Sequence, residues 1–143
     1  MTPSPRMPNA ARLWLGLGAL NGLLALCAAA FGRHGLAVSD SEFREVFMIG
    51  VDFHMWHALA LLATAAFAAR GGLRPDGGEA GTHDSGALTV AGGAFTLGII
   101  LFSGSLYVMG VTGAPPIAGA APLGGSLFMA GWAALIWAAV KGR

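Results

Sequence analysis

The chain has little charge for its length. Charged residues make up 10% of its 143 residues, whereas a soluble domain averages about 25%. Its net charge of +1 gives no reason to expect nucleic acid as a partner. Cys27 is the one cysteine, which excludes an intramolecular disulfide and a zinc site built from several cysteines.

Apolar residues are abundant instead, at 55% of the chain, and glycine occurs 23 times. Glycine is more frequent in membrane helices than in soluble ones. Four apolar segments approach or exceed the roughly 20 residues that a helix needs to cross a bilayer. They are 13–31, 53–69, 87–110 and 123–140. The sequence therefore predicts an all-α integral membrane four-helix bundle that forms a single domain, residues 1–143.

The first segment also has features of a secretory signal peptide. Arg6 and Arg12 precede it, and three alanines at 28–30 resemble a cleavage site. Its apolar stretch is longer than the 7 to 15 residues typical of a signal peptide's hydrophobic region. We therefore expect it to be kept as a membrane span.

The distribution of Lys and Arg predicts the orientation. With four spans, both termini and the loop 71–86 share one side of the membrane. That side carries Arg6, Arg12, Arg70, Arg74, Lys141 and Arg143, and the other carries Arg33 and Arg44. Because positive charge favours the cytoplasmic side, we expect both termini in the cytoplasm and the protein in the inner (plasma) membrane. The loop 71–86 is Gly-rich and polar, which is typical of a flexible linker.

The second helix is predicted to begin before its membrane span. Ser39 and Glu42 have the spacing of a capping box, and Asp40 and Glu42 favour the first turn of a helix. A helix that starts near Asp40 and continues through 53–69 extends beyond the membrane at its N-terminal end.

Two histidines, His54 and His57, lie where this helix enters the apolar run. At about 100° per residue, both fall on one stripe of the helix with Phe47, Gly50 and Leu61. The opposite face carries Asp52, Trp56 and Leu59. Both imidazoles are therefore expected to point toward a neighbouring helix, and Asp52 away from them.

Three interpretations of these histidines remain open. His34 follows the first span, so His34, His54 and His57 could gather at the outer end of the first two helices and bind a metal or haem. Each imidazole could instead bond a carbonyl or hydroxyl of a neighbouring helix and hold the packing. Proton transfer is the third interpretation.

Other polar residues inside the spans are predicted to make helix-packing contacts. Ser103 and Tyr107 share a helix face, and both could partner His57 or Asn21. No catalytic serine is expected, because no Gly-x-Ser-x-Gly motif surrounds the serines of the third span. The full set of predicted packing contacts is Asn21, Ser103, Ser105 and Tyr107. Tryptophans at 14, 132 and 137 are expected to anchor the protein at the membrane interface or to face lipid.

Several stretches resemble the family named domain of unknown function 423, which includes transmembrane protein 256. They occur in order over all four spans. They are AFGRHGL (30–36), HALALL (57–62), GIILFSGSLY (98–107), TG (112–113), and PLGG (122–125) with GW (131–132).

The resemblance implies a four-helix membrane fold and no established activity. Residues that match the family pattern are His34, His57, Ser103, Ser105, Tyr107, Gly124 and Gly125. The chain departs from the pattern at His54, where the family usually has Gln, and at Ala121, where Thr is common. A site made by His54 with His57 would thus not be a family property, and His34 with His57 is the pair to test.

Taken together, the sequence favours a non-enzymatic membrane protein that acts as an accessory or stabilising subunit of a larger complex. Its expected partners are the lipid bilayer and either another membrane protein or further copies of itself. The alternative is a binding protein for a metal, haem or lipophilic molecule at the outer interface through His34 and His57. An accessory or stabilising subunit requires no cofactor.

Overall fold

A computed structural model describes residues 7–36, 40–71 and 85–141, and within them all regular structure is helical. Four helices are long and apolar enough to cross a membrane, as predicted. In chain order the elements are α1 (Asn9–Ala30), the π-helical turn η1 (Phe31–Gly35), α2 (Ser41–Gly71), α3 (Ser85–Gly98), the π-helical turn η2 (Ile99–Ser103), α4 (Gly104–Thr112) and α5 (Ala120–Lys141). The loop predicted at 71–86 falls mostly outside the described residues.

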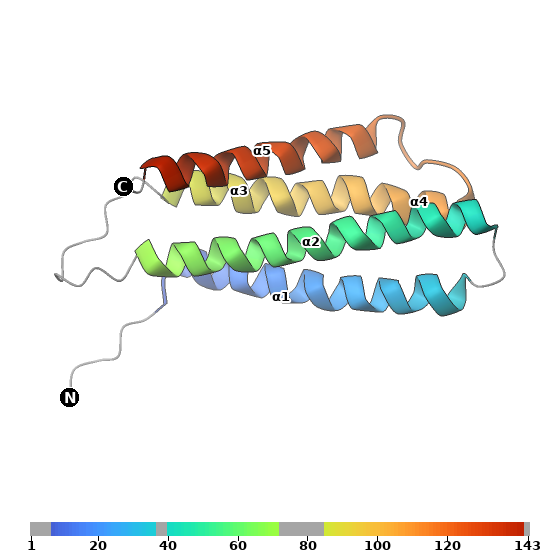
Figure 1. Cartoon of the computed structure of the whole chain (residues 1–143), viewed down its shortest axis with the longest axis horizontal. Coiled ribbons are helices and arrows are strands. Elements are labelled where there is room, and N and C mark those ends of the chain that lie inside the picture. The colour runs from blue at the N-terminus through green and yellow to red at the C-terminus, as the bar shows by residue number, and fades with distance from the viewer. Residues whose placement is uncertain (1–6, 37–39, 72–84, 142–143) are drawn as a thin grey trace.

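The helices lie side by side, with α2 and the continuous helix α3–η2–α4 in the centre and α1 and α5 on the flanks (Figure 1). Accordingly, the two central helices bury a larger share of their residues than α1 and α5 do. The first residue of α1 and the last residue of α5 lie at one end of the bundle, which we call the terminal end. The opposite end, where α1 gives way to α2 and α4 to α5, is the loop end.

Helix termini at the loop end have clear local causes. The Asp40 carboxylate accepts a hydrogen bond from the Glu42 backbone N–H at 3.0 Å, which caps α2. Ser39, the predicted cap, lies outside the described residues. Gly113 adopts φ 76°, and its N–H bonds the Met109 carbonyl at 2.8 Å, which ends α4. Gly119, at φ 83°, occupies the same left-handed region just before α5.

Contact between the α3–α4 helix and α5 depends on small residues. A Cβ atom at Gly124 would collide with the backbone nitrogen of Phe102, and one at Gly131 or Gly98 would collide with the rings of Phe95 or Phe128. These glycines let the two helices approach closely, as in many membrane helix pairs. The position of α5 against the α3–α4 helix is therefore fixed by backbone contact as well as by side chains.

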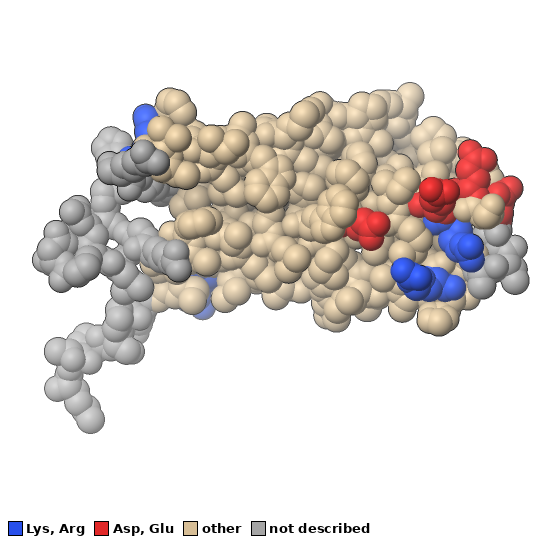
Figure 2. Space-filling view, viewed as in Figure 1, with Lys and Arg blue, Asp and Glu red and all other residues tan. Residues whose placement is uncertain are grey.

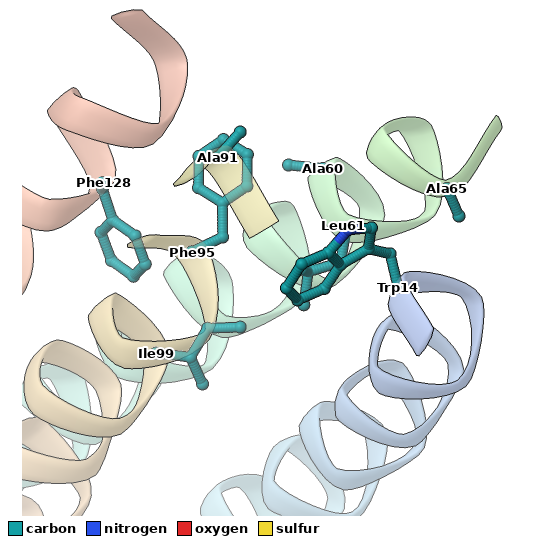
Figure 3. Close-up of a cluster of buried hydrophobic side chains, with 8 residues drawn as sticks. All are labelled: Trp14, Ala60, Leu61, Ala65, Ala91, Phe95, Ile99 and Phe128. Atoms are coloured by element: carbon teal, nitrogen blue, oxygen red, sulfur yellow. The ribbon is translucent and has the colours of Figure 1, made fainter. Parts of the chain in front are cut away.

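The apolar core has two parts. The larger cluster lies toward the terminal end and draws residues from all four long helices (Figure 3). Its members are Trp14, Ala60, Leu61, Ala65, Ala91, Phe95, Ile99 and Phe128. The smaller cluster lies toward the loop end and contains Leu36, Phe47 and Val51. Along α2, His54 and His57 lie between the two clusters.

The predicted faces of α2 are confirmed. Phe47, Gly50 and both histidines are buried, whereas Asp52 is exposed, as are Trp56 and Leu59. The expectation that Trp14 faces lipid is wrong: only 6% of its surface is exposed. Its ring fills the space that Gly92 leaves open on α3, which a pattern along α1 alone does not reveal.

Candidate functional site

Polar side chains of the core gather around the middle of α2, between the two apolar clusters. Buried polar residues of the described chain are His54, His57, Thr64, Ser103 and Ser105. Thr64 donates to the carbonyl of Ala60 in its own helix. The other four lie on α2 and on the η2–α4 segment that packs against it. This layer is the candidate site.

His54 connects three helices. Its Nε2 lies 3.0 Å from the Asn21 side-chain oxygen on α1, and its Nδ1 lies 2.9 Å from the Tyr107 hydroxyl on α4. The Asn21 amide nitrogen donates to the Leu17 carbonyl at 2.8 Å. The result is a continuous chain of hydrogen bonds across the bundle, from the backbone of α1 through α2 to α4.

The partners of His54 define its proton arrangement. Because the Asn21 nitrogen is engaged by Leu17, the Asn21 oxygen faces His54 and can only accept. His54 therefore donates from Nε2–H, and in the neutral ring the unprotonated Nδ1 accepts from the Tyr107 hydroxyl. Both ring nitrogens are in use.

His57 has different surroundings, although it lies only one turn further along the helix. Its Nδ1 is 2.7 Å from the Phe53 carbonyl of the same helix, and its Nε2 accepts from the Trp132 indole N–H on α5 at 3.3 Å. Its ring stacks on that of Phe128, with centroids 3.5 Å apart and planes 6° from parallel. His57 thus connects α2 to α5, mainly through aromatic contact.

The two imidazoles are held in opposite neutral tautomers. A carbonyl only accepts, so His57 carries its proton on Nδ1, and Nε2 receives the Trp132 N–H. His54 carries its proton on Nε2. In neither residue does a ring nitrogen keep a free lone pair for a metal. The arrangement favours the helix-packing interpretation of both histidines over ligation.

Ser103, Ser105 and Tyr107 behave differently from one another. Tyr107 meets His54, whereas the sequence suggested His57 or Asn21 as its partner. Ser105 bonds the Leu101 carbonyl of its own helix. Ser103 is fully buried, and its hydroxyl makes no hydrogen bond to any described residue. Ser103 closes the π-helical turn η2, a feature often found at functional sites.

His34 is separate from this layer. It is exposed on η1, two residues beyond Gly32, which packs against Phe47 and Met48. Phe47 precedes His57 by ten residues, or about 15 Å along α2. The structure thus does not bring His34 and His57 together. Across the described ranges, no three His, Cys, Asp or Glu side chains lie close enough to hold a metal ion.

The contribution of α5 to this layer was not predicted from the sequence. Trp132 was expected to face lipid, but its N–H bonds His57 while 48% of its surface stays exposed. Gly124, Phe128 and Gly131, spaced by four and three residues, mark the inner face of α5. Phe128 lies on this face and stacks on His57, and Trp132 follows Gly131 in the sequence. The spacing of the glycines was therefore the signal that could have predicted which face of α5 packs against the bundle.

Comparison with known proteins assigns the chain to a family. A family model described as protein of unknown function (DUF423) matches residues 28–125. The chain belongs to this family. The resemblance seen in the sequence is thereby confirmed, and the matched region includes both core histidines, Ser103, Ser105 and Tyr107.

Bacterial relatives match nearly the whole chain. The UPF0382 membrane protein YwdK of Bacillus subtilis is 38% identical over 131 residues, which is 91% of this chain and 98% of that protein. UPF0382 membrane proteins of Staphylococcus aureus and Haemophilus influenzae are 34% and 30% identical over the same share of this chain, covering 97% and 95% of their own lengths. No solved structure matches the chain. The DUF423 chain is thus a small membrane protein with four helices that can span the bilayer.

Proposed function

We propose that this DUF423 protein is a non-enzymatic accessory or stabilising subunit of a larger membrane complex. One observation carries the proposal: both ring nitrogens of His54 and of His57 are engaged by protein groups. Such saturated groups hold helices in place and are not poised for chemistry. A rigid bundle whose polar groups serve its own packing fits a structural role in an assembly.

The proposed setting is the inner membrane, with both termini in the cytoplasm and the loop end outside. Arg33 and Arg44 are the two basic residues at the loop end, and the other six lie on the opposite side in this arrangement. α2 has 31 residues, or about 46 Å at 1.5 Å per residue, against about 30 Å of hydrocarbon. Its first turns then extend beyond the hydrocarbon on the outer side.

The test is purification of the tagged protein from its own membranes in a mild detergent, followed by native mass measurement. We expect a species heavier than the monomer that contains at least one other protein. We also expect that deletion of the gene lowers the amount of that partner. A lone monomer with no co-purifying protein would overturn the proposal.

The alternative function is binding of a metal, haem or lipophilic molecule at the outer interface. His34 favours it, because this imidazole is exposed and makes no hydrogen bond or ion pair to a described residue. His57 would have to give up its bonds to Phe53 and Trp132 in order to take part. Elemental analysis and an absorbance spectrum of the purified protein test this alternative, which predicts bound metal or a haem band that is lost in His34→Ala.

A further inference from the structure

One surface of α2 faces away from the bundle and differs from the other exposed helix faces. Ile49, Asp52, Trp56 and Leu59 are all exposed, and their spacing of three or four residues puts them on one stripe. We call this stripe the Asp52 face. Its apolar residues can contact lipid or another membrane helix. Its carboxylate is costly in either environment unless it pairs with a cation.

The depth of Asp52 follows from contacts inside the bundle. Gly124 packs against Phe102, and the Phe102 ring lies beside the Phe53 ring, with centroids 4.7 Å apart. α5 begins four residues before Gly124, about 6 Å nearer the loop end. Asp52 directly precedes Phe53 and thus lies at a depth that all four helices cover.

Asp52 is unusual at that depth. The segments 13–30, 87–112 and 123–140 carry no charged residue. In the view of Figure 2 most charged side chains gather at the loop end, and one acidic patch stands apart along the uncharged surface. Asp52 makes no hydrogen bond or ion pair to any described residue.

We propose that the Asp52 face docks against a membrane helix of another protein, and that this helix carries Lys or Arg at the same depth. The inference rests on the proposed function and names the surface through which this subunit joins its complex. Charged residues in membrane spans almost always face a protein interior and pair there. The complementary cation must come from the partner, because no described residue of this chain supplies it.

Trp56 strengthens the match to a basic side chain. It follows Asp52 by four residues and therefore lies on the same face, and its ring packs against that of Phe53 at 5.0 Å between centroids. An indole face attracts Lys and Arg cations. A carboxylate and an indole one turn apart thus offer two contacts to one cation.

A second copy of this chain fits the Asp52 face poorly. Copies related by an axis along the membrane normal meet at equal depths, so Asp52 would face an apolar residue or another Asp52. The nearest candidate cation is Arg33, which follows Gly32. Because Gly32 packs against Met48, Gly32 lies about 6 Å closer to the loop end than Asp52, and Arg33 lies one residue beyond it.

The experiment is site-specific photocrosslinking of the full chain in its own membranes. A benzophenone amino acid replaces Leu59 on the Asp52 face, or, as matched controls, Leu24 on α1 or Ile136 on α5, all of which are exposed. We expect a crosslink to another protein from position 59 only. Peptide mapping should place it in an apolar segment that holds Lys or Arg.

Charge variants then test the role of Asp52. Asp52→Asn should lower the crosslink yield at position 59 by about tenfold, the effect of losing one desolvated charge pair. Glu45→Gln removes the same charge nearer the loop end and should change the yield less than about twofold. Exchange of Asp52 with the partner's basic residue should restore the yield. Unchanged thermal unfolding of Asp52→Asn excludes misfolding as the cause.

Failure of this inference is distinguishable from failure of the proposed function. A complex that crosslinks through α1 or α5, through a segment without Lys or Arg, or equally well with Asp52→Asn overturns the inference alone. Crosslinking to a second copy also overturns it. A chain that crosslinks to no protein and purifies as a lone monomer overturns both.

Discussion

The surroundings of His54 and His57 show two ways of using the same side chain in a membrane bundle. His54 is bonded at both nitrogens to other helices, to Asn21 on α1 and to Tyr107 on α4. One ring nitrogen of His57 bonds the Phe53 carbonyl of its own helix. Its contact with α5 consists of a ring stacked on Phe128 and a longer hydrogen bond of 3.3 Å to Trp132. The contacts of His54 with α1 and α4 are therefore determined by hydrogen bonds, and the contact of His57 with α5 mainly by the fit of the stacked rings.

The two histidines thus show that the flanking helices α1 and α5 are attached to the centre of the bundle in different ways. Besides the packing of Trp14 against Gly92, α1 is joined to the centre of the bundle through a hydrogen-bond chain, which an apolar side chain cannot replace. α5 is held by aromatic stacking and by glycines such as Gly124 that bring its backbone close. Substitutions of His54, His57 and Gly124 should thus have effects of different size and kind.

The largest effect is expected at Gly124. In Gly124→Ala the new Cβ would collide with the Phe102 backbone, so α5 must move away from its seat and His57 loses its partners. We expect a loss of about 3 kcal/mol in the free energy of unfolding, measured by SDS titration in mixed micelles. Gly125→Ala is the matched control, because its Cβ meets only the Phe102 ring at an ordinary 3.8 Å. Equal losses in the two variants would contradict the close seat of α5.

A smaller loss is expected for His54→Leu. The variant leaves the Asn21 oxygen and the Tyr107 hydroxyl without their shared partner, which should cost about 2 kcal/mol. A double-mutant cycle with Tyr107→Phe should show coupling, because the two residues share one bond. If the two effects simply add, the hydrogen bond contributes nothing to stability.

His57→Phe should cost less, about 0.5–1 kcal/mol. Phenylalanine keeps the stack on Phe128 and loses only the bonds to Phe53 and Trp132. The same titration compares it with His54→Leu and with His54→Phe. A loss at position 57 that exceeds the loss at position 54 would reverse the comparison between the two histidines.

The smallest effect is expected at Ser103. Its hydroxyl is buried without a partner among the described residues, so Ser103→Ala removes an unsatisfied group and should leave stability unchanged or raise it by about 0.5 kcal/mol. Ser105→Ala loses a bond to the Leu101 carbonyl and serves as the control. A clear destabilisation at Ser103 alone would indicate that its hydroxyl has a partner, such as bound water, in the folded protein.

Much of the fold is predictable from the sequence. The four spans follow from apolar length. The buried face of α2 follows from its periodicity, because His54 and His57 fall on the side opposite Asp52. Trp14 shows where this reasoning ends. On α1 both the lipid-facing and the core-facing residues are apolar, so hydrophobicity alone does not distinguish its two sides.

The candidate site was predictable only in part. The residues that make it up can be read from the sequence, since polar side chains in a span need partners. Their pairing cannot, because the partner of Tyr107 depends on how far α4 is turned about its own axis. The stacking of Phe128 on His57 likewise depends on the seat of α5, to which only the spacing of Gly124 and Gly131 points.

The π-helical turn η2 has a consequence for how this helix can change during evolution. The Gly104 N–H bonds the Ile99 carbonyl, which puts one more residue into that turn than an α-helix has. Deleting a residue there would rotate α4 relative to α3 by about 100° and turn Tyr107 away from His54. Insertions and deletions should therefore be rare at η2, and substitutions should covary with α5 on one side of it and with α2 on the other.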